Sequence, residues 1–278
     1  MPEPIHITDP SDPRVREYAS LKEGDLQRGI DERSPHGAFI GEGALIAEHL
    51  LESGYPCRSL LIAAGHEGAY QRLIARVPAG VPVYLASNEV LHALVGFKFH
   101  RGLLAAGSRR PRPGCEEALD LIATAPALVV LEDLTNLDNL GGIFRCASAL
   151  APEGTVVVLS PRCCDPLYRK AIRVSMGHSL RIPFVVLEDW AAASSQIRRA
   201  GFELVALTPR ADAEPLRAAA APARERRVAI ALGSEGPGLS DQLMSAADRC
   251  VRIEQRAGVD SLNVMVAGAI AMSALLRL

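Results

Sequence analysis

The sequence predicts a protein of the α/β class with two domains. Its 278 residues exceed what one core usually organises, since domains of about 150 residues are the norm. Hydrophobic residues make up 49% of the chain and aromatic residues only 4%, which indicates cores of Ala, Val, Leu and Ile, as in helices packed on parallel strands. In the second half of the chain, short apolar runs alternate with helical stretches, the pattern of a parallel sheet covered by helices.

No membrane segment, secretion signal or metal site is expected. The chain has no run of roughly 18 or more apolar residues, and Met1–Pro4 lacks the basic and then apolar pattern of a signal peptide, which favours the cytoplasm. Six cysteines without a C-x-x-C pair or a cysteine–histidine cluster predict buried free thiols and no metal. A net charge of −2 argues against nonspecific coating of nucleic acid, but it allows a local basic face.

Residues 1–107 are expected to form a small α/β domain. Residues 1–35, dense in Pro, Asp and Arg, are interpreted as an irregular arm. Beyond them, three apolar runs predict strands and three stretches with helical periodicity predict helices. The predicted strands are 59–63, 81–85 and 102–106, and the predicted helices are 44–53, 69–76 and 88–95.

Residues 108–118 are interpreted as a linker between the domains. The segment Ser108–Gly114 combines prolines, a glycine and like charges without apolar periodicity. Arg109 and Arg110 in this segment are candidate RNA contacts. A solvated linker without a partner explains the same residues equally well.

Residues 119–278 form the second predicted domain. Its apolar runs are apolar on both faces, as parallel strands covered by helices require. The predicted strands are 127–131, 155–159, 184–187, 204–207, 228–232 and 250–253, and the predicted helices are 141–151, 165–176, 190–200, 239–246 and 261–277. Ligands of such sheets bind in the loops at the carboxyl ends of the strands, and three of these loops have unusual chemistry.

The first loop is Asp138–Arg145. Its paired glycines allow close approach of a ligand to the backbone, and Asn139 is placed to cap the helix that follows. That helix would bury a stripe that includes Ile143 and Ala147, which leaves Arg145 off the buried face. Capped helices of this kind are common, so the loop alone does not predict a function.

The second loop, Leu232–Ser240, leaves an all-apolar strand. Three glycines and a proline impose a tight, stiff turn with open backbone groups, suited to gripping a purine edge or a carboxylate. Glu235 lies in the middle of this turn. An ordinary strand-to-helix turn with a solvated glutamate is the alternative interpretation.

The third loop runs from Ile253 to Val264 and includes a flexible stretch at 256–259. Ser261 or Asp260 would suffice as the cap of the next helix. Asn263 is not explained in that way, because an amide in the first turn of a buried helix needs a partner. The helix itself is apolar on nearly every face, which predicts that it is buried or lies at an interface.

Together, the three loops resemble the signature motifs of the SpoU (TrmH-like) family of SPOUT methyltransferases. The matching segments are N-L-G-G-I-F-R at 139–145, G-S-E-G-P-G-L-S at 233–240 and S-L-N-V at 261–264. Each is weak alone, but all three in this order are specific. The resemblance covers about residues 120–278. Residues 1–107 are similar, less specifically, to the ribosomal-protein-like substrate-recognition domain often fused in front, through Phe39–Gly43 and His100–Gly102.

The resemblance implies a C-terminal, trefoil-knotted SPOUT methyltransferase domain with a parallel sheet, preceded by a small α/β substrate-recognition domain. It also implies S-adenosyl-L-methionine (AdoMet) as cosubstrate, held mainly by main-chain groups, and no metal. The cofactor-binding positions fall on this chain at Leu232, Gly233, Gly238, Ile253 and Leu262. Such proteins are typically homodimers whose active site is completed across the interface, and the apolar final helix agrees with that.

The reaction that the resemblance implies is methyl transfer from AdoMet to a ribose 2′-hydroxyl of structured RNA. Arg145 would lie beside the hydroxyl, and the other matched catalytic positions are Asn139, Glu235, Ser261 and Asn263. A guanidinium stays protonated at neutral pH and is a poor base, so stabilisation of a developing alkoxide is the safer description of its role. The sequence does not distinguish ribosomal from transfer RNA.

Arg162 and Arg169 lie where such proteins often carry a substrate-facing loop, and they are candidate RNA contacts unless they belong to a solvated helix face. Two other functions compete. A Rossmann-type nucleotide enzyme is disfavoured because neither G-x-G-x-x-G nor G-x-x-x-x-G-K-[ST] follows a strand. A catalytically silent RNA-binding or ribosome-associated protein would keep the fold, but the intact Arg145, Glu235 and Asn263 argue for activity.

Overall fold

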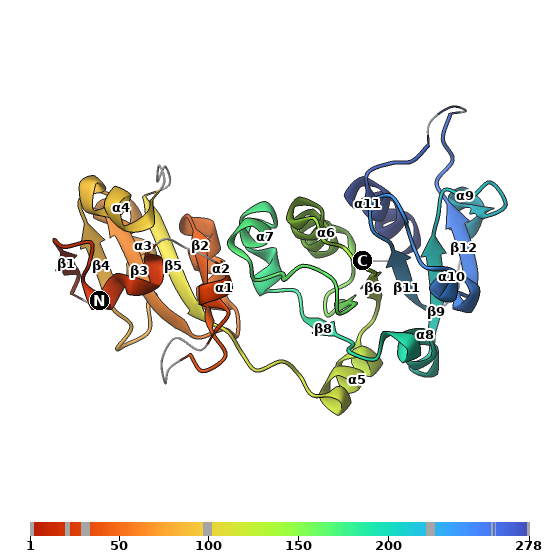
Figure 1. The fold of residues 1–278 in the computed structure, drawn as a ribbon, viewed down its shortest axis with the longest axis horizontal. Coiled ribbons are helices and arrows are strands. Elements are labelled where there is room, and N and C mark those ends of the chain that lie inside the picture. The colour runs from red at the N-terminus through yellow and green to blue at the C-terminus, as the bar shows by residue number, and fades with distance from the viewer. Residues whose placement is uncertain are drawn as a thin grey trace. The chain divides into compact units, whose positions relative to one another are not determined.

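The computed structural model divides the chain into two compact units (Figure 1). The residues it describes are 3–19, 23–28, 34–96, 102–220, 226–256, 258 and 260–276. Met1–Pro111 and Leu167–Arg181 form the N-terminal unit, and Arg112–Pro166 and Ile182–Leu278 form the C-terminal unit. Among the described helices, none is long and apolar enough to cross a membrane.

The N-terminal unit contains a five-stranded mixed sheet in the order β1-β4-β3-β5-β2. The strands are β1 (Ile5–Ile7), β2 (Ala38–Glu42), β3 (Cys57–Ala63), β4 (Val83–Ala86) and β5 (Leu103–Ser108). The longer helices of the first 111 residues are α2 (Ala44–Glu52) and α4 (Asn88–Val95), and the short ones are η1 (Pro13–Tyr18), α1 (Glu23–Leu26), η2 (Glu67–Tyr70) and α3 (Gln71–Ile74). β5 pairs antiparallel with both β2 and β3, and the other pairs are parallel.

The N-terminal arm is more ordered than the sequence predicts. Within the described part of residues 1–35, Ile5–Ile7 form β1, which extends the sheet by pairing with β4. The ion pair between Glu17 and Arg58 is buried at 2.7 Å and holds η1 against β3. The expectation of an irregular arm is therefore wrong for these segments. His100 and Arg101, which carried part of the resemblance, lie outside the described residues.

Residues 167–181 fall within the predicted second domain but pack with the N-terminal unit. They contain α7 (Arg169–Val174) and η3 (His178–Leu180), where the sequence predicts one helix over 165–176. The contact is made by α7 against β2 and by the buried His49 of α2, whose Nδ1 lies 3.0 Å from the carbonyl oxygen of Met176. Periodicity along the chain indicates a helix here but not the unit on which it packs.

The C-terminal unit contains a seven-stranded, fully parallel sheet in the order β10-β12-β9-β11-β6-β7-β8. The strands are β6 (Leu128–Leu131), β7 (Val156–Leu159), β8 (Phe184–Val186), β9 (Phe202–Leu207), β10 (Glu214–Pro215), β11 (Arg227–Leu232) and β12 (Arg249–Arg252). The helices are α5 (Cys115–Thr124), α6 (Leu137–Leu150), α8 (Trp190–Arg199), α9 (Leu216–Ala219), α10 (Asp241–Ala246) and α11 (Val264–Leu275). The predicted α/β class with a parallel sheet is confirmed.

The apolar runs form the centre of this sheet because helices cover both of its faces. Every side chain of β6 and β7 is buried, which matches their unbroken Leu and Val sequences. α6 and α11 pack directly against each other (Figure 1). Gly142 makes this close packing possible, because a Cβ there would lie 2.0 Å from the sulfur of Met265.

The predicted linker is shorter than expected. α5 begins at Cys115, so residues 115–118 are helical, and β5 extends to Ser108. Only residues 109–114 lie between these two elements. The two-residue β10 and the one-turn α9 have no signal in the sequence, because their length is too short for a periodicity. The trefoil knot stays a prediction.

Candidate active site

A pocket of about 380 Å³ opens at the carboxyl ends of β9, β11 and β12. This is the edge of a parallel sheet at which ligands bind. All five predicted cofactor-binding residues line it, namely Leu232, Gly233, Gly238, Ile253 and Leu262. The structure therefore brings two of the three predicted loops, Leu232–Ser240 and Ile253–Val264, to one cavity, whereas the loop Asp138–Arg145 does not line it.

The glycine-rich loop, which we define as residues 233–239 between β11 and α10, folds back on itself. Ser234 and Gly238 form an isolated antiparallel bridge, with the Gly238 N–H donating to the Ser234 oxygen at 3.1 Å. A Cβ on Gly233 would lie 2.1 Å from the carbonyl carbon of Gly238, so only glycine allows the two ends of the loop to approach so closely.

Three predicted catalytic residues form a hydrogen-bonded triangle. Asn139 Nδ2 donates to Glu235 Oε1 at 2.6 Å, and Asn263 Nδ2 donates to Asn139 Oδ1 at 2.9 Å and to Glu235 Oε1 at 3.2 Å. Asn139 is on α6, Glu235 is in the glycine-rich loop and Asn263 precedes α11. The partner that the sequence predicts for the Asn263 amide is therefore present, and the triangle ties the three motif segments together.

The helix caps differ from those predicted. Asn136 caps α6, since its Oδ1 accepts from the N–H groups of Asp138 and Asn139 at 2.8 and 3.3 Å. Asn263 itself caps α11 through its Oδ1, which makes both Asp260 and Ser261 wrong as cap predictions. α6 thus begins before residue 141 and α11 begins after residue 261. The reason is that Asn136 caps the first helix and Asn263 caps the second.

The other two predicted catalytic residues lie apart from the triangle. Ser261 lines the pocket. Arg145 is exposed on α6, more than one turn beyond Asn139, and does not line the pocket. Within the part of the chain that the structure describes, no hydrogen bond or ion pair is seen for its guanidinium, so this charge faces solvent in a single copy of the chain.

The four predicted RNA-binding arginines lie in different surroundings. Arg109 Nε donates to the Ala38 oxygen at 3.0 Å, and Arg110 donates to the Gly54 oxygen and lies over the ring of Tyr55. These two residues directly follow β5 and pack back on the N-terminal unit. Neither behaves as a residue of a free linker, and of the two only Arg110 is exposed.

Arg162 and Arg169 differ in exposure. The side chain of Arg162 is 80% exposed and pairs with Asp133. The hydrogen bond from Arg162 holds the pKa of Asp133 below its ordinary value of 3.8, so Asp133 is ionised at neutral pH. Arg169 is half-buried at the first position of α7. Arg162 is thus the more accessible of the two to a phosphate.

Sequence reasoning missed three pocket residues, Thr208, Pro209 and Gln255. Thr208 and Pro209 directly follow β9, and Gln255 lies three residues beyond β12, so their positions after strand ends could have identified them. Gln255 Oε1 is buried and has no hydrogen-bond partner within the described residues. A buried acceptor without a donor is costly, by about 1–3 kcal/mol, and this one belongs to a residue that lines a pocket.

Comparison with known proteins agrees with this arrangement. A model of the SpoU rRNA Methylase family matches residues 126–273. An uncharacterized tRNA/rRNA methyltransferase of Mycobacterium tuberculosis is 37% identical over 265 residues, which cover 95% of this chain and 89% of that protein. A 23S rRNA (guanosine-2′-O-)-methyltransferase of Ralstonia nicotianae is 27% identical over 202 residues, covering 72% of this chain and 78% of that protein.

A solved structure also shares the fold. The AdoMet-bound rRNA methyltransferase from Sinorhizobium meliloti superposes with a TM-score of 0.75 at 22% sequence identity. The match covers 96% of this chain and 95% of that one. It therefore includes both units.

Proposed function

Because the chain belongs to the SpoU rRNA Methylase family, we propose that it is an AdoMet-dependent methyltransferase acting on a ribose 2′-hydroxyl of RNA. The observation that carries the proposal is the triangle of Asn139, Glu235 and Asn263 beside the pocket, since it joins the three segments that define the resemblance. The relative of Ralstonia nicotianae, a 23S rRNA (guanosine-2′-O-)-methyltransferase, supports the 2′-hydroxyl as the acceptor.

The pocket fits AdoMet in size and chemistry. A volume of about 380 Å³ lies within the range of small-molecule sites. Leu232, Ile253 and Leu262 supply apolar walls for an adenine ring, and the open backbone at Gly233 supplies polar groups. The buried Oε1 of Gln255, which has no donor among the described residues, can accept a hydrogen bond, and AdoMet offers an exocyclic amine, ribose hydroxyls and an ammonium group.

Different residues of the chain have different roles in the proposed reaction. AdoMet, when bound, supplies a methyl group on a positively charged sulfur. Asn139, Glu235 and Asn263 fix α6, the glycine-rich loop and the start of α11 relative to one another, so that the acceptor can be held in line. Arg145 stabilises the negative charge that develops on the ribose oxygen, and Ser261 at the pocket lining helps to orient the nucleotide.

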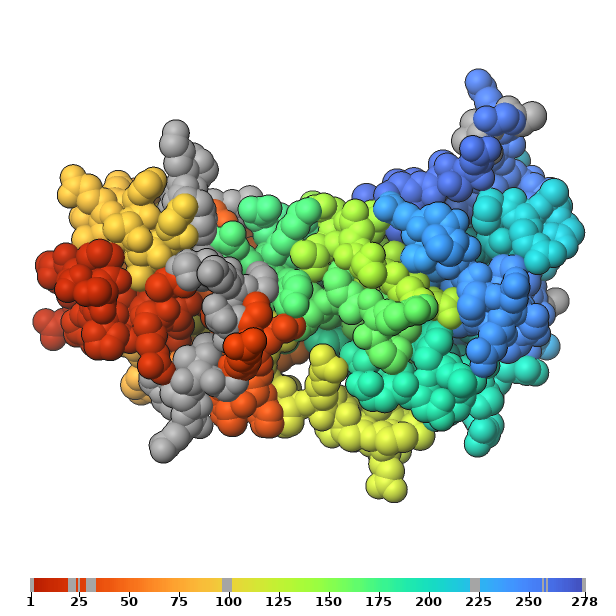
Figure 2. All heavy atoms as spheres, viewed as in Figure 1, coloured from red at the N-terminus to blue at the C-terminus, as the bar shows by residue number. Residues whose placement is uncertain are grey.

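The active protein is a homodimer in this proposal. Val266 and Ile270 on α11 are 42% and 38% exposed, one helical turn apart, and they form an apolar stripe. The blue C-terminal part of the chain lies at the surface in the view of Figure 2. A second copy covering this stripe would bring its own Arg145 near the pocket, whose lining includes no arginine among the described residues of one chain.

RNA is held by the N-terminal unit and by arginines. Arg109, Arg110, Arg162 and Arg169 are the proposed phosphate contacts, with Arg162 the most accessible. Ribosomal or transfer RNA is the substrate class, and the cytoplasm is the proposed compartment. A silent RNA-binding protein with the same fold is the competing function, and the intact triangle argues against it.

The decisive experiment is transfer of labelled methyl groups from AdoMet to total RNA, with nucleoside mass spectrometry to locate the label on the ribose. The wild-type protein is expected to label RNA, and Arg145→Ala to lose at least about 100-fold in rate with its AdoMet affinity within about twofold of wild type. No transfer by the wild-type protein to any RNA would contradict the proposal. Loss of AdoMet affinity in the variant would reassign Arg145 to the cofactor.

A further inference from the structure

Glu132, the residue directly after β6, contacts both ends of the glycine-rich loop. Its backbone N–H donates to the oxygen of Leu232, which precedes the loop, at 2.9 Å. Its carboxylate accepts from the backbone N–H of Ser240, which follows the loop, at 2.7 Å and from the Ser240 hydroxyl at 2.8 Å. One residue therefore connects the entry and the exit of the loop.

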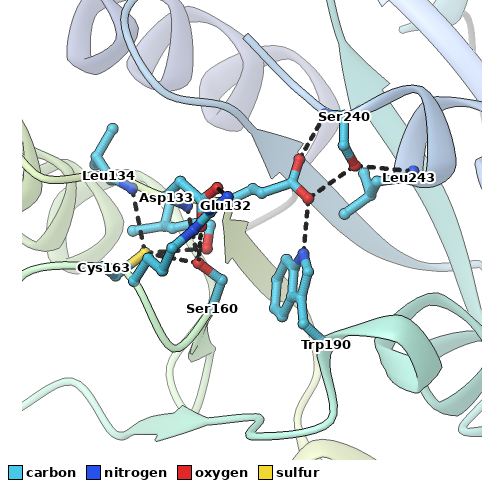
Figure 3. A network of polar contacts seen from close by, with 10 residues as sticks. Glu132, Asp133, Leu134, Ser160, Cys163, Trp190, Ser240 and Leu243 are labelled. Carbon is cyan, nitrogen blue, oxygen red and sulfur yellow. Dashed lines mark hydrogen bonds and ion pairs between the residues drawn. The ribbon is translucent and has the colours of Figure 1, made fainter. Parts of the chain in front are cut away.

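The carboxylate of Glu132 is buried, with only 4% of the residue exposed. A third donor reaches it from another element, because Trp190 Nε1, at the start of α8, donates to Glu132 Oε1 at 2.7 Å (Figure 3). Hydrogen bonds to an ionised acceptor are about twice as strong as neutral ones. We call Glu132, Trp190 and Ser240 the Glu132 network.

The Glu132 network is anchored at both of its ends. Ser240 caps α10, since its Oγ accepts from the Leu243 N–H at 3.2 Å. On the other side, the Asp133 N–H donates to Ser160 Oγ at 2.8 Å, and the Ser160 hydroxyl donates back to Asp133 Oδ1 at 2.8 Å (Figure 3). Glu132 thus has a fixed backbone from which to hold the loop.

We infer that Glu132 is a positioning residue for the AdoMet pocket, acting through the backbone of the glycine-rich loop. The loop turns at Gly236 and Gly238, both at positive φ, and Glu132 fixes the two ends between which this turn is formed. The same loop lines the pocket through Gly233 and Gly238 and carries Glu235 into the triangle. This inference rests on the proposed function, since it takes the pocket to be the AdoMet site.

Trp190 makes the inference measurable. It is the only tryptophan of the chain, so the intrinsic tryptophan emission comes from the Glu132 network alone. Binding of AdoMet to the wild-type protein is expected to change this emission, because the glycine-rich loop and the indole share one carboxylate. A residue with a purely structural role would affect thermal stability without linking the emission to the ligand.

The test compares Glu132→Gln with Glu153→Gln, which makes the same change at an exposed carboxylate between α6 and β7. The amide presents N–H groups to donors, so the network loses bonds while the side-chain shape is kept. Glu132→Gln is expected to weaken AdoMet binding by calorimetry about tenfold or more and to raise the KM for AdoMet similarly, with kcat within about threefold of wild type. Glu153→Gln is expected to match wild type throughout.

A second readout needs no ligand. Amide hydrogen exchange of residues 233–240 in AdoMet-free protein is expected to accelerate in Glu132→Gln and not in Glu153→Gln. Ser240→Ala removes the hydroxyl bond to Glu132 and the cap of α10 but keeps the carboxylate and its bond to the Ser240 N–H, so it replaces Glu132→Gln should that variant not fold. Its AdoMet affinity is expected to fall by about threefold.

The outcomes separate the two proposals. A wild-type protein that binds no AdoMet overturns the proposed function. A wild-type protein that binds AdoMet without a change in Trp190 emission overturns the inference alone, as do variants of the network with wild-type affinity and wild-type loop exchange.

Discussion

Asn263 uses both ends of its amide for different purposes. Its Oδ1 accepts from the N–H groups of Met265 and Val266 at 3.0 and 3.4 Å and so caps α11. Its Nδ2 donates to Asn139 and Glu235. The side chain therefore sets the start of a helix and its link to the pocket at the same time, which an ionised aspartate could not do because it has no hydrogen to donate.

Replacing Asn263 by aspartate separates these two roles. Asn263→Asp keeps an oxygen for the cap, and a negative charge suits a helix N-terminus. It also removes both donated bonds and places a second carboxylate beside Glu235. We expect a melting temperature near that of wild type but methyl transfer reduced at least about tenfold. Asn263→Ala, which loses the cap too, is expected to lose about 1 kcal/mol of stability as well; equal activity in wild type and Asn263→Asp would refute the role of the triangle.

For single residues, the sequence predicts which side chains belong to the site more reliably than it predicts which of them cap helices. Asn139 and Asn263 were singled out, and both lie in the triangle, but the cap of each helix went to a different residue than predicted. The reason is that Asn136 and Asn139 are equally plausible caps by type, and the choice depends on a bond to Glu235, which is 96 residues away in sequence. Gln255 was not singled out, although its position three residues beyond β12 could have identified it.

α6 and α11 form the element pair on which the site depends, because one carries Asn139 and Arg145 and the other follows Asn263. Their contact passes through Gly142 and Met265. The buried strands nearby were predictable because β6 and β7 are apolar throughout and β11 is apolar from Val228 to Leu232. α5 was not predicted because the prolines before Cys115 favour the interpretation of residues 108–118 as a linker.

Gly142→Ala tests this contact. Alanine is favoured over glycine within a helix by about 1 kcal/mol, so the substitution would stabilise an unhindered position. Because a Cβ would lie 2.0 Å from the Met265 sulfur, we expect a net loss of about 1–3 kcal/mol in the free energy of unfolding. The same change at Gly68, where a Cβ meets open space, is the control. Shortening Met265 to alanine alongside Gly142→Ala is expected to recover part of the loss; no recovery would point to another cause.

A second element contact makes stability depend on pH. Burial, with the charge of Arg181 second, lowers the pKa of His49 below its ordinary value of 6.5. The unfolded chain therefore binds this proton more readily than the folded one, so stability is full above pH 6.5 and falls as the pH drops toward the lowered pKa. Urea unfolding at several pH values is expected to show a flatter pH dependence below 6.5 in His49→Gln than in wild type. Exposed His92→Gln is the control, and parallel curves for wild type and His49→Gln would exclude this origin.

For the whole molecule, the sequence predicts two domains but does not predict that residues 167–181 pack with the N-terminal one. The apolar runs define the parallel sheet, whereas the choice of α7 to pack on β2 depends on side chains such as His49 that are far away in sequence. The α11 surface shows the same limit of local patterns. Its composition predicts an interface, and the exposed Val266 and Ile270 locate the side of the helix that is available.

Val266→Glu with Ile270→Glu is expected to convert the proposed dimer into a monomer, since two charges at the centre of an apolar interface are costly to desolvate. Sedimentation at micromolar concentration measures the change, and methyl transfer is expected to fall with it. Leu45→Glu, at an exposed apolar residue of α2, is the matched control and is expected to leave the mass unchanged. A wild-type protein that is active as a monomer would remove the idea of a shared site.

The strand order has a consequence for the way the chain is made. β6 pairs with β7 on one edge and with β11 on the other, and β11 does not begin until residue 227. A chain leaving the ribosome N-terminus first therefore exposes an apolar strand edge for much of its synthesis, a situation that invites association between nascent chains. The residues that line the pocket run from Leu207 to Ala267, so the pocket forms only after most of the chain has been synthesised. Its ligand can therefore stabilise the completed protein but not a nascent chain.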